Sequence, residues 1–267
     1  MMKLSFSTLA CPEWSLSEIC KAAVDHGYDG IEIRGIGRHT FLPDIEEFSD
    51  ENCRNTMKEI RGKGLDIPVF SSDCVLCVKD GTDEILSNAI RYVEAASLCG
   101  VPFVRVLCDH QPTPSDVDFA FTADNLMDLA AFSADMDVCL LVETNGYFAS
   151  SRNMKRLLRR VGDLPVMVLW DMNHTCRYFQ ESPEETYDRI GEYIAHVHVK
   201  DSVMAEGGMS YRLPGEGDIP LEKAVKVLEA NGYQGYYSLE WLRRWDSSLE
   251  ESGVVLPHYV HYMKNLL

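Results

Sequence analysis

Two histidines separated by one residue, His196 and His198, lie in a short apolar segment that begins at Ile194 and continues into Lys200 and Asp201. The β-branched residues of this segment predict a short buried strand. Because strand side chains alternate between two faces, both histidines are expected on the same face. This arrangement indicates a chemical site at the end of the strand, and its chemistry depends on what the neighbouring strands contribute at the same level.

Three carboxylates follow three other apolar runs directly: Glu143, Asp171 and Glu240. A buried carboxylate without a partner is costly, so four consecutive strand ends with metal-competent side chains favour a shared site over four unrelated polar residues. Three carboxylates and the imidazole of His198 form an oxygen-rich set of ligands. Such a set suits Mn²⁺, Mg²⁺ or Co²⁺, with Zn²⁺ as an alternative. The sequence therefore predicts a divalent metal site with open positions for two substrate oxygens.

Predicted strands and helices alternate along the whole chain. The strands are expected at residues 4–9, 30–34, 65–74, 101–108, 138–142, 166–170, 195–199 and 236–239. The helices are expected at residues 16–26, 50–63, 82–98, 114–136, 153–161, 184–193 and 221–231, and from the last strand to about residue 267. Such alternation implies right-handed parallel βαβ units. Eight units in about 250 residues match a closed barrel.

The fold class predicted from this pattern is α/β, a (β/α)8 TIM barrel that forms a single domain over residues 1–267. A doubly wound parallel sheet is the competing arrangement. That fold often has a glycine-rich phosphate loop after its first strand, whereas this chain has no GxGxxG or GxxxxGK[ST] motif at residues 7–12. Parallel barrels carry their reactive groups at the carboxyl ends of the strands, where the four predicted ligands stand.

The composition restricts the class of substrate and the compartment. The 267 residues include 42 acidic and 25 basic side chains, for a formal net charge of -17. Such an acidic chain repels nucleic acid and anionic membranes, so a small-molecule substrate is expected, although a local basic pocket could still hold one phosphate. No apolar run is long enough for a membrane span or a signal peptide. Nine scattered cysteines indicate reduced thiols and a cytoplasmic protein, and homo-oligomerisation stays open.

The chain resembles the xylose-isomerase-like TIM barrels of sugar and sugar phosphate isomerases and epimerases. The resemblance covers essentially the whole chain and is carried by residues 27–34, Glu143, Asp171-x-x-His174, His196-x-His198 and Ser238-x-Glu240. In the ketose 3-epimerases of this family, the matching positions imply metal ligation by Glu143, Asp171, His198 and Glu240. The resemblance also implies that Glu143 and Glu240 are the catalytic acid/base pair and that His174 contacts a substrate oxygen.

The chemistry expected of this site is proton transfer at a carbon beside a carbonyl group. A cation bound to the hydroxyl and carbonyl oxygens of an α-hydroxyketone acidifies the C–H between them and stabilises the enediolate. One carboxylate removes that proton. Return of a proton to the other face by the second carboxylate gives epimerisation, and return to the neighbouring carbon gives isomerisation. Glu143 and Glu240 must therefore stand on opposite sides of the substrate.

Lys200 is a candidate substrate-binding residue, because its ammonium group could polarise a substrate oxygen or hold a phosphate. The alternative is an ion pair of Lys200 with Asp201 or Glu32. His196 is interpreted as a hydrogen-bonded residue beneath the metal rather than a ligand.

A loop after the seventh predicted strand holds two further candidates for substrate binding, Arg212 and Glu216. Arg212 resembles the substrate-contacting arginine of the family, and the alternative is a solvated loop charge. Trp14 and Trp241 are expected in loops at the same end of the barrel. They could form an apolar wall over the C–H faces of a sugar, or they could only pack between loops.

Three other functions compete with isomerisation or epimerisation. The first is a lyase of the inosose dehydratase type, which begins with the same proton abstraction and then loses a β-hydroxyl. The second is a hydrolase like endonuclease IV, which shares the barrel but uses additional histidines after the seventh strand, where this chain reads Gly215 to Ile219 without one. The third is a non-catalytic sugar-binding barrel, which would not need two opposed carboxylates.

Overall fold

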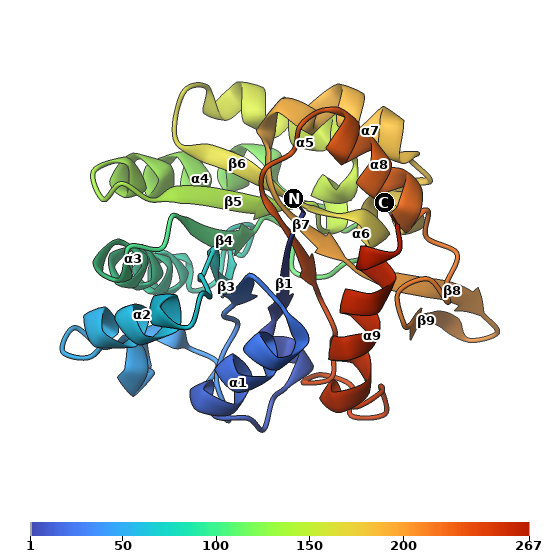
Figure 1. Ribbon diagram of the computed structural model, residues 1–267. Coiled ribbons are helices and arrows are strands. Elements are labelled where there is room, and N and C mark those ends of the chain that lie inside the picture. Colours follow the sequence, from blue (N-terminus) through green and yellow to red (C-terminus); the bar gives the residue numbers. More distant parts are fainter. Residues whose placement is uncertain (1, 267) are drawn as a thin grey trace.

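The computed structural model describes residues 2–266, and in it eight parallel strands form a barrel surrounded by helices (Figure 1). The barrel strands are β1 (Lys3–Ser7), β2 (Gly30–Glu32), β3 (Val69–Val75), β4 (Phe103–Leu107), β5 (Cys139–Glu143), β6 (Val166–Asp171), β7 (Ile194–Val199) and β10 (Tyr236–Leu239). Their order in the sheet is β2-β1-β10-β7-β6-β5-β4-β3. Parallel bridges between Gly30 and Asp66 and between Ile33 and Phe70 join β2 to the β3 segment and complete the circuit. The predicted TIM barrel is confirmed, and residues 1 and 267 of the predicted domain lie outside the described range.

Helices follow the strands and pack around the barrel (Figure 1). They are α1 (Leu16–His26), α2 (Cys53–Gly62), α3 (Thr82–Cys99), α4 (Phe119–Ala134), α5 (Ser151–Val161), α7 (Pro183–Ile190), α8 (Leu221–Ala230) and α9 (Ser252–Lys264). Short 3₁₀ turns lie at Thr8–Ala10, Leu42–Asp44, Glu46–Phe48, Gly146–Ala149 and Gly191–Tyr193. Helix α1 begins directly after Ser15 because the side chains of Ser15 and Glu18 form a capping box. Across residues 2–266, no helix combines the length and the apolar character that crossing a membrane requires.

Two features near the carboxyl ends of the strands were not predicted. One is the short helix α6 (Met172–Phe179), which starts because the Oδ1 atom of Asp171 accepts the backbone N–H groups of Asn173 and His174. The other is an antiparallel hairpin of β8 (Asp201–Ala205) and β9 (Gly208–Arg212), which replaces part of the predicted loop and extends beyond the ring of helices (Figure 1). Both features begin directly after predicted site residues.

The interior of the barrel has an apolar layer below a polar layer. Val69, Leu141 and Leu169 are fully buried and form a small cluster of their own inside the barrel. Because side chains two positions apart share a face, the next inward residues on the same strands are Ser71, Glu143 and Asp171. The apolar layer closes the bottom of the barrel, so the polar groups gather at the carboxyl ends of the strands.

The cysteines behave as the composition predicts. All nine are free thiols, and six of them are buried. Burial raises the pKa of Cys74 to about 11, which leaves only a small thiolate fraction near neutral pH.

Candidate metal centre

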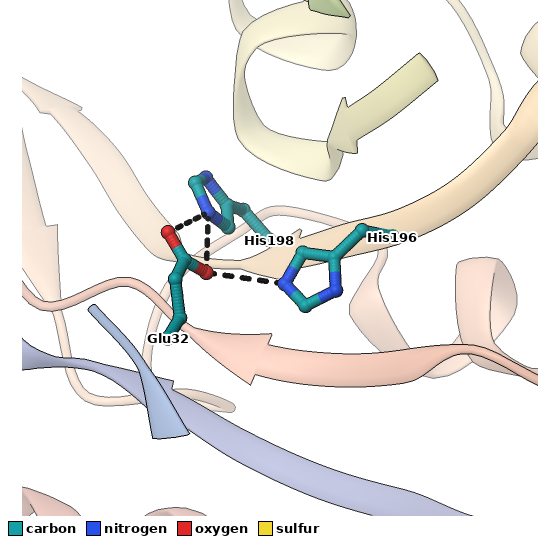
Figure 2. A group of neighbouring side chains, drawn as sticks. All are labelled: Glu32, His196 and His198. Atoms are coloured by element: carbon teal, nitrogen blue, oxygen red, sulfur yellow. Dashed lines mark hydrogen bonds and ion pairs between the residues drawn. The ribbon is translucent and has the colours of Figure 1, made fainter. Parts of the chain in front are cut away.

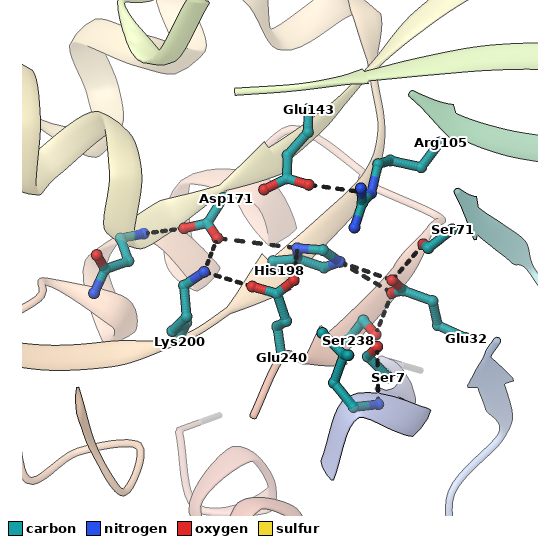
Figure 3. Close-up of polar contacts among 12 residues, drawn as sticks. Ser7, Glu32, Ser71, Arg105, Glu143, Asp171, His198, Lys200, Ser238 and Glu240 are labelled. Atoms are coloured by element: carbon teal, nitrogen blue, oxygen red, sulfur yellow. Dashed lines mark hydrogen bonds and ion pairs between the residues drawn. The ribbon is translucent and has the colours of Figure 1, made fainter. Parts of the chain in front are cut away.

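Glu143, Asp171, His198 and Glu240 converge at the carboxyl ends of β5, β6 and β7 and directly after β10 (Figure 3). One ligand atom from each residue lies within 4.8 Å of the others, and all four side chains are buried. The register explains this convergence, because Asp171 is paired with His198 and His198 with Ser238, two residues before Glu240. Four buried groups, three of them carboxylates, form a compact oxygen-rich set of potential ligands.

The imidazole of His198 is oriented with one nitrogen free for a ligand. Its Nε2 atom donates to the carboxylate of Glu32, at 3.0 and 3.1 Å from the two oxygens (Figure 2). Its Nδ1 atom is buried without a hydrogen-bond partner, 3.5 Å from Glu240 Oε1 and 3.9 Å from Asp171 Oδ2. A buried nitrogen without a partner that faces two carboxylates fits a cation between them, so these residues suit a divalent metal.

Glu32 is the central hydrogen-bond acceptor beneath the cluster. It accepts from His198, from His196 Nε2 at 3.1 Å, from Ser71 Oγ at 2.6 Å and from Ser238 Oγ at 2.8 Å. Burial alone would raise the pKa of Glu32, but the two histidines lower it well below the usual value. The carboxylates have the opposite effect on His198. Burial would lower the pKa of His198, but Glu32 and Glu240 raise it to about 9. Glu32 therefore holds the orientation of His198, and His196 lies beside Glu32 as a hydrogen-bonded residue.

Lys200 enters the cluster from the end of β7. Its Nζ atom lies 2.6 Å from Asp171 Oδ2 and 2.5 Å from Glu240 Oε2 (Figure 3). The same atom is 3.2 Å from His174 Nε2. Burial would lower the pKa of Lys200, but Asp171 and Glu240 raise it well above the usual value. The sequence suggested Asp201 or Glu32 as alternative partners of Lys200. In the described part of the chain, neither forms an ion pair with it within 4 Å.

His174 lies on α6, one turn after Asp171. Its Nδ1–H donates to the backbone carbonyl of Thr144 at 3.0 Å, which leaves Nε2 to accept from Lys200. The same Nδ1 atom is 3.6 Å from Glu143 Oε1 and 3.6 Å from Asp171 Oδ2. Burial lowers the pKa of His174, so the neutral ring is favoured. The structure therefore places His174 beside Glu143 and Asp171, and its contact with a substrate oxygen stays a prediction.

Arg105 is a member of the cluster that the sequence analysis missed. It lies on β4, fully inside the barrel, with Nε 3.2 Å from Glu143 Oε2 and Nη1 donating to the carbonyl of Ser72 at 2.7 Å. The sequence signal that could have identified Arg105 is its position as the single arginine in the apolar run at residues 101–108. Charged residues are rarely fully buried without a partner, so its position in a predicted central strand indicates a polar interior.

Asp201 anchors the segment that follows the β8–β9 hairpin. Its carboxylate accepts backbone N–H groups from Gly215, Gly217 and Ile219 at 2.9, 3.0 and 3.2 Å. A Cβ atom at Gly217 would lie 2.0 Å from Asp201 Oδ1, so only glycine fits at this position. The carboxylate thus holds the segment that carries Arg212 and Glu216 against the barrel.

Substituting Gly217 by alanine is expected to release this segment, because the new methyl group displaces the carboxylate that binds it. The loss of buried hydrogen bonds predicts a decrease of about 1–3 kcal/mol in the free energy of unfolding. Limited proteolysis is expected to cut near residues 213–219 faster than in the unchanged protein. Gly253→Ala is the matched control, since a Cβ there meets open space. Equal cleavage rates in both variants would contradict the anchoring role of Asp201.

The other predicted substrate residues lie at two separate places. Arg212, Glu216 and Trp241 line a cavity of about 350 Å³ together with Tyr211, whose ring centre is 5.9 Å from Lys200 Nζ. Trp14 lines a different cavity of about 150 Å³ beside the start of α9, so the structure does not place it with Trp241 in one wall. A larger cavity of about 720 Å³ lies between α7 and α8 and contains none of the cluster residues.

The buried cluster of acids, imidazoles and a lysine lies at the carboxyl ends of the strands, which is where parallel-barrel enzymes carry their reactive groups. The chain belongs to the xylose isomerase-like TIM barrel family, whose model matches residues 20–256. The family assignment suggested by the sequence motifs is thereby confirmed.

Known relatives of the chain include an epimerase and a dehydratase. The fructoselysine 3-epimerase of Shigella flexneri is 24% identical over 249 residues, which cover 90% of each chain. The inosose dehydratase of Yersinia enterocolitica is 25% identical over 222 residues, which cover 72% of this chain and 74% of the relative. Among solved structures, the IOLI protein with a bound zinc atom has a TM-score of 0.80 at 17% identity, covering 99% of this chain and 98% of that chain.

Proposed function

We propose that this protein is a metal-dependent isomerase or epimerase of a small sugar or polyol-ketone, with the metal held by Glu143, Asp171, His198 and Glu240. The observation that carries the proposal is the convergence of these ligand atoms within 4.8 Å, with His198 Nδ1 facing Glu240 and Asp171 without a hydrogen-bond partner. Three carboxylates favour Mn²⁺, Mg²⁺ or Co²⁺, and Zn²⁺ is the alternative. A cation in this place supplies Lewis acidity, which lowers the pKa of the C–H between the carbonyl and hydroxyl groups of an α-hydroxyketone.

Glu143 and Glu240 are proposed as the proton-transfer pair. In Figure 3 their side chains enter the cluster from opposite sides, and each has its own cation, Arg105 for Glu143 and Lys200 for Glu240. Burial would raise the pKa of Glu240, but Lys200 and His198 lower it, so this carboxylate is ionised and able to accept a proton. One glutamate removes the proton from carbon and the other returns one, to the opposite face in epimerisation or to the neighbouring carbon in isomerisation.

Lys200 and His174 are proposed to bind substrate oxygens. Both are buried beside the glutamates, and the Lys200 ammonium is a hydrogen-bond donor close to both Asp171 and Glu240. The 350 Å³ cavity lined by Arg212, Glu216 and Trp241 adjoins Lys200 through Tyr211, and it is proposed to receive the remainder of the substrate. Trp14 lies in a separate cavity and has no part in this arrangement. The fructoselysine 3-epimerase, which aligns over 90% of both chains, supports an epimerase assignment.

A dehydratase on the same site is the second candidate. Two observations favour it: the inosose dehydratase among the relatives, and a buried ammonium group 2.5 Å from the proposed base. After Glu240 removes the proton, Lys200 could donate one to a departing β-hydroxyl, so that an enone and water form. The lysine would then regain its proton from solvent or from the glutamate.

The test is a panel of ketoses and inososes in D₂O with Mn²⁺-loaded protein, followed by NMR. Epimerisation and isomerisation replace one carbon-bound hydrogen with deuterium and release no water, whereas dehydration releases one water for each product. We expect exchange at a carbon beside the carbonyl group, and we expect a chelator to abolish it. Equal rates for metal-stripped and metal-loaded protein would contradict the proposal.

A further inference from the structure

Three arginines lie in the half of the barrel that does not supply the proposed metal ligands. The proposed ligands come from the contiguous strands β5, β6, β7 and β10. Arg34 follows β2 and Arg105 lies on β4, in the other half of the barrel. Arg244 follows β10 but turns toward that half, because its backbone N–H donates to the carbonyl of Leu9 after β1. We call Arg34, Arg105 and Arg244 the arginine arc.

Arg34 and Arg105 contact neighbouring residues in the middle of β3. Arg105 Nη1 donates to the carbonyl of Ser72 at 2.7 Å, and Arg34 Nη2 lies 3.9 Å from the carboxylate of Asp73, the next residue. Both arginine side chains are more than nine-tenths buried. Burial lowers the pKa of Arg34, and the positive charge of Arg105 lowers it further. Two buried guanidinium groups therefore stand close enough to repel each other.

Arg244 joins the pair through the loop that follows β2. Its Nη1 atom donates to the carbonyl of Gly37 at 2.8 Å, and Arg34 Nη1 donates to the carbonyl of Thr40 in the same loop at 3.3 Å. Burial and the charge of Arg34 lower the pKa of Arg244. The ring of Trp245, centred 5.7 Å from the guanidinium carbon of Arg34, lies over Arg34 and is itself more than half exposed.

The arc has fewer anionic partners than its charge requires. The Nε and Nη2 atoms of Arg244 are buried without a hydrogen-bond partner, whereas Arg105 is paired with Glu143. In the described part of the chain, Arg244 has no carboxylate within 4 Å, and Arg34 has only the half-exposed Asp73 at 3.9 Å. A chain with 42 acidic residues does not lack carboxylates, so their absence here is informative. Guanidinium groups whose buried N–H donors lack a partner are suited to bind an oxyanion.

We propose that the arginine arc is a subsite for an anionic group of the substrate, a carboxylate or a phosphate. Its position relative to the reacting carbon rests on the proposed function, whereas anion binding itself does not. Arg105 contacts both Glu143 and Ser72 in β3, so the arc begins beside one glutamate of the proposed proton-transfer pair. A substrate that reaches from the metal ligands across the mouth would place its anionic end among these arginines. A small sugar or polyol-ketone with one acidic substituent has this chemistry.

The first test measures anion binding without turnover. Inorganic phosphate and glycerate are titrated calorimetrically into Mn²⁺-loaded protein at low ionic strength, with Arg34→Met, Arg244→Met and the double variant beside the unchanged protein. We expect each single variant to bind the preferred anion about 10- to 100-fold more weakly, because a charge-assisted hydrogen bond to a buried arginine is lost. Arg34→Lys keeps the charge and is expected to restore part of the affinity. Arg160→Met, at an exposed ion pair on α5, is the matched control.

The comparison of the two anions distinguishes a carboxylate from a phosphate subsite. Circular dichroism and metal content establish that each variant is folded and loaded, and any anion binding by the metal itself is common to all of them. Equal affinity of the unchanged protein and the double variant for both anions would overturn the proposal.

The second test separates this subsite from the proposed function. The ratio of kcat/KM for an acidic or phosphorylated ketose to that for its neutral counterpart is expected to fall about 10-fold or more in Arg34→Met. If no ketose exchanges its C–H but anion binding still depends on Arg34 and Arg244, the proposed function fails and the subsite stands. If exchange occurs and neither the ratio nor anion binding responds to the two substitutions, the subsite is wrong and the function stands.

Discussion

Replacing Glu240 by glutamine is expected to reduce C–H exchange in the preferred ketose by about 10²- to 10⁴-fold, the usual contribution of a general base. The amide cannot accept the proton. It also replaces a carboxylate of the proposed metal site, whose Oε1 atom lies 3.5 Å from His198 Nδ1. Glu143→Gln is expected to have an effect of similar size, because this glutamate is proposed to act on the opposite face. Exchange is measured by NMR in D₂O, starting separately from each epimer, so that each glutamate is assigned to one face.

The control for both substitutions is Glu222→Gln, which removes the same charge from an exposed ion pair with Lys226 on α8. We expect it to exchange at the rate of the unchanged protein. Metal content is measured in every variant, because Glu143 and Glu240 are proposed to act both as ligands and as acid/base groups. If Glu143→Gln and Glu240→Gln each retain full exchange, the two-carboxylate mechanism is wrong.

Replacing Glu32 by alanine is expected to decrease the free energy of unfolding by about 3–5 kcal/mol, as is typical when one partner of a buried ion pair is removed. The substitution leaves four buried donors without their acceptor, those of Ser71, His196, His198 and Ser238. For a chain of this size we expect Tm to fall by roughly 2–4 °C per kcal/mol. Urea unfolding and thermal scans measure the two quantities.

The same substitution is expected to weaken metal binding by about 10- to 100-fold, because Glu32 holds the His198 ring with Nδ1 toward the carboxylates. A competition titration with a chelator of known affinity measures this loss. Glu192→Ala is the control for both effects, since Glu192 is exposed and, among residues 2–266, forms an ion pair only with Lys155. We expect less than about 1 kcal/mol from it. Unchanged metal affinity in Glu32→Ala would show that the ring orientation has another cause.

The four proposed metal ligands could be predicted from the sequence because each one directly follows or ends an apolar run. Glu143, Asp171, His198 and Glu240 stand at the ends of predicted strands, and a parallel barrel brings such ends to one edge. The structure brings the four ligand atoms within 4.8 Å of one another. Their roles as metal ligands stay a prediction, which the experiments above address.

The local elements around the centre were less predictable. The helix α6 starts at the very carboxylate that was interpreted as a ligand, so Asp171 both caps a helix and faces the cluster. The β8–β9 hairpin reads as a loop in the sequence because its strands are short, polar and exposed at the tip. Neither element has the apolar periodicity on which sequence prediction depends.

The sequence by itself determined the order of the elements and the edge at which the reactive groups collect, because alternation and apolar runs are local properties of the chain. Only the tertiary structure decided which charged groups meet. Glu32 reaches His196 and His198 across 164 and 166 residues of sequence, and Lys200 binds Asp171 and Glu240 rather than its neighbour Asp201. These pairings depend on barrel closure and on the direction of each side chain, which no local pattern encodes. The arginine arc arises in the same way, because Arg34, Arg105 and Arg244 are far apart in sequence and become neighbours only when the barrel closes.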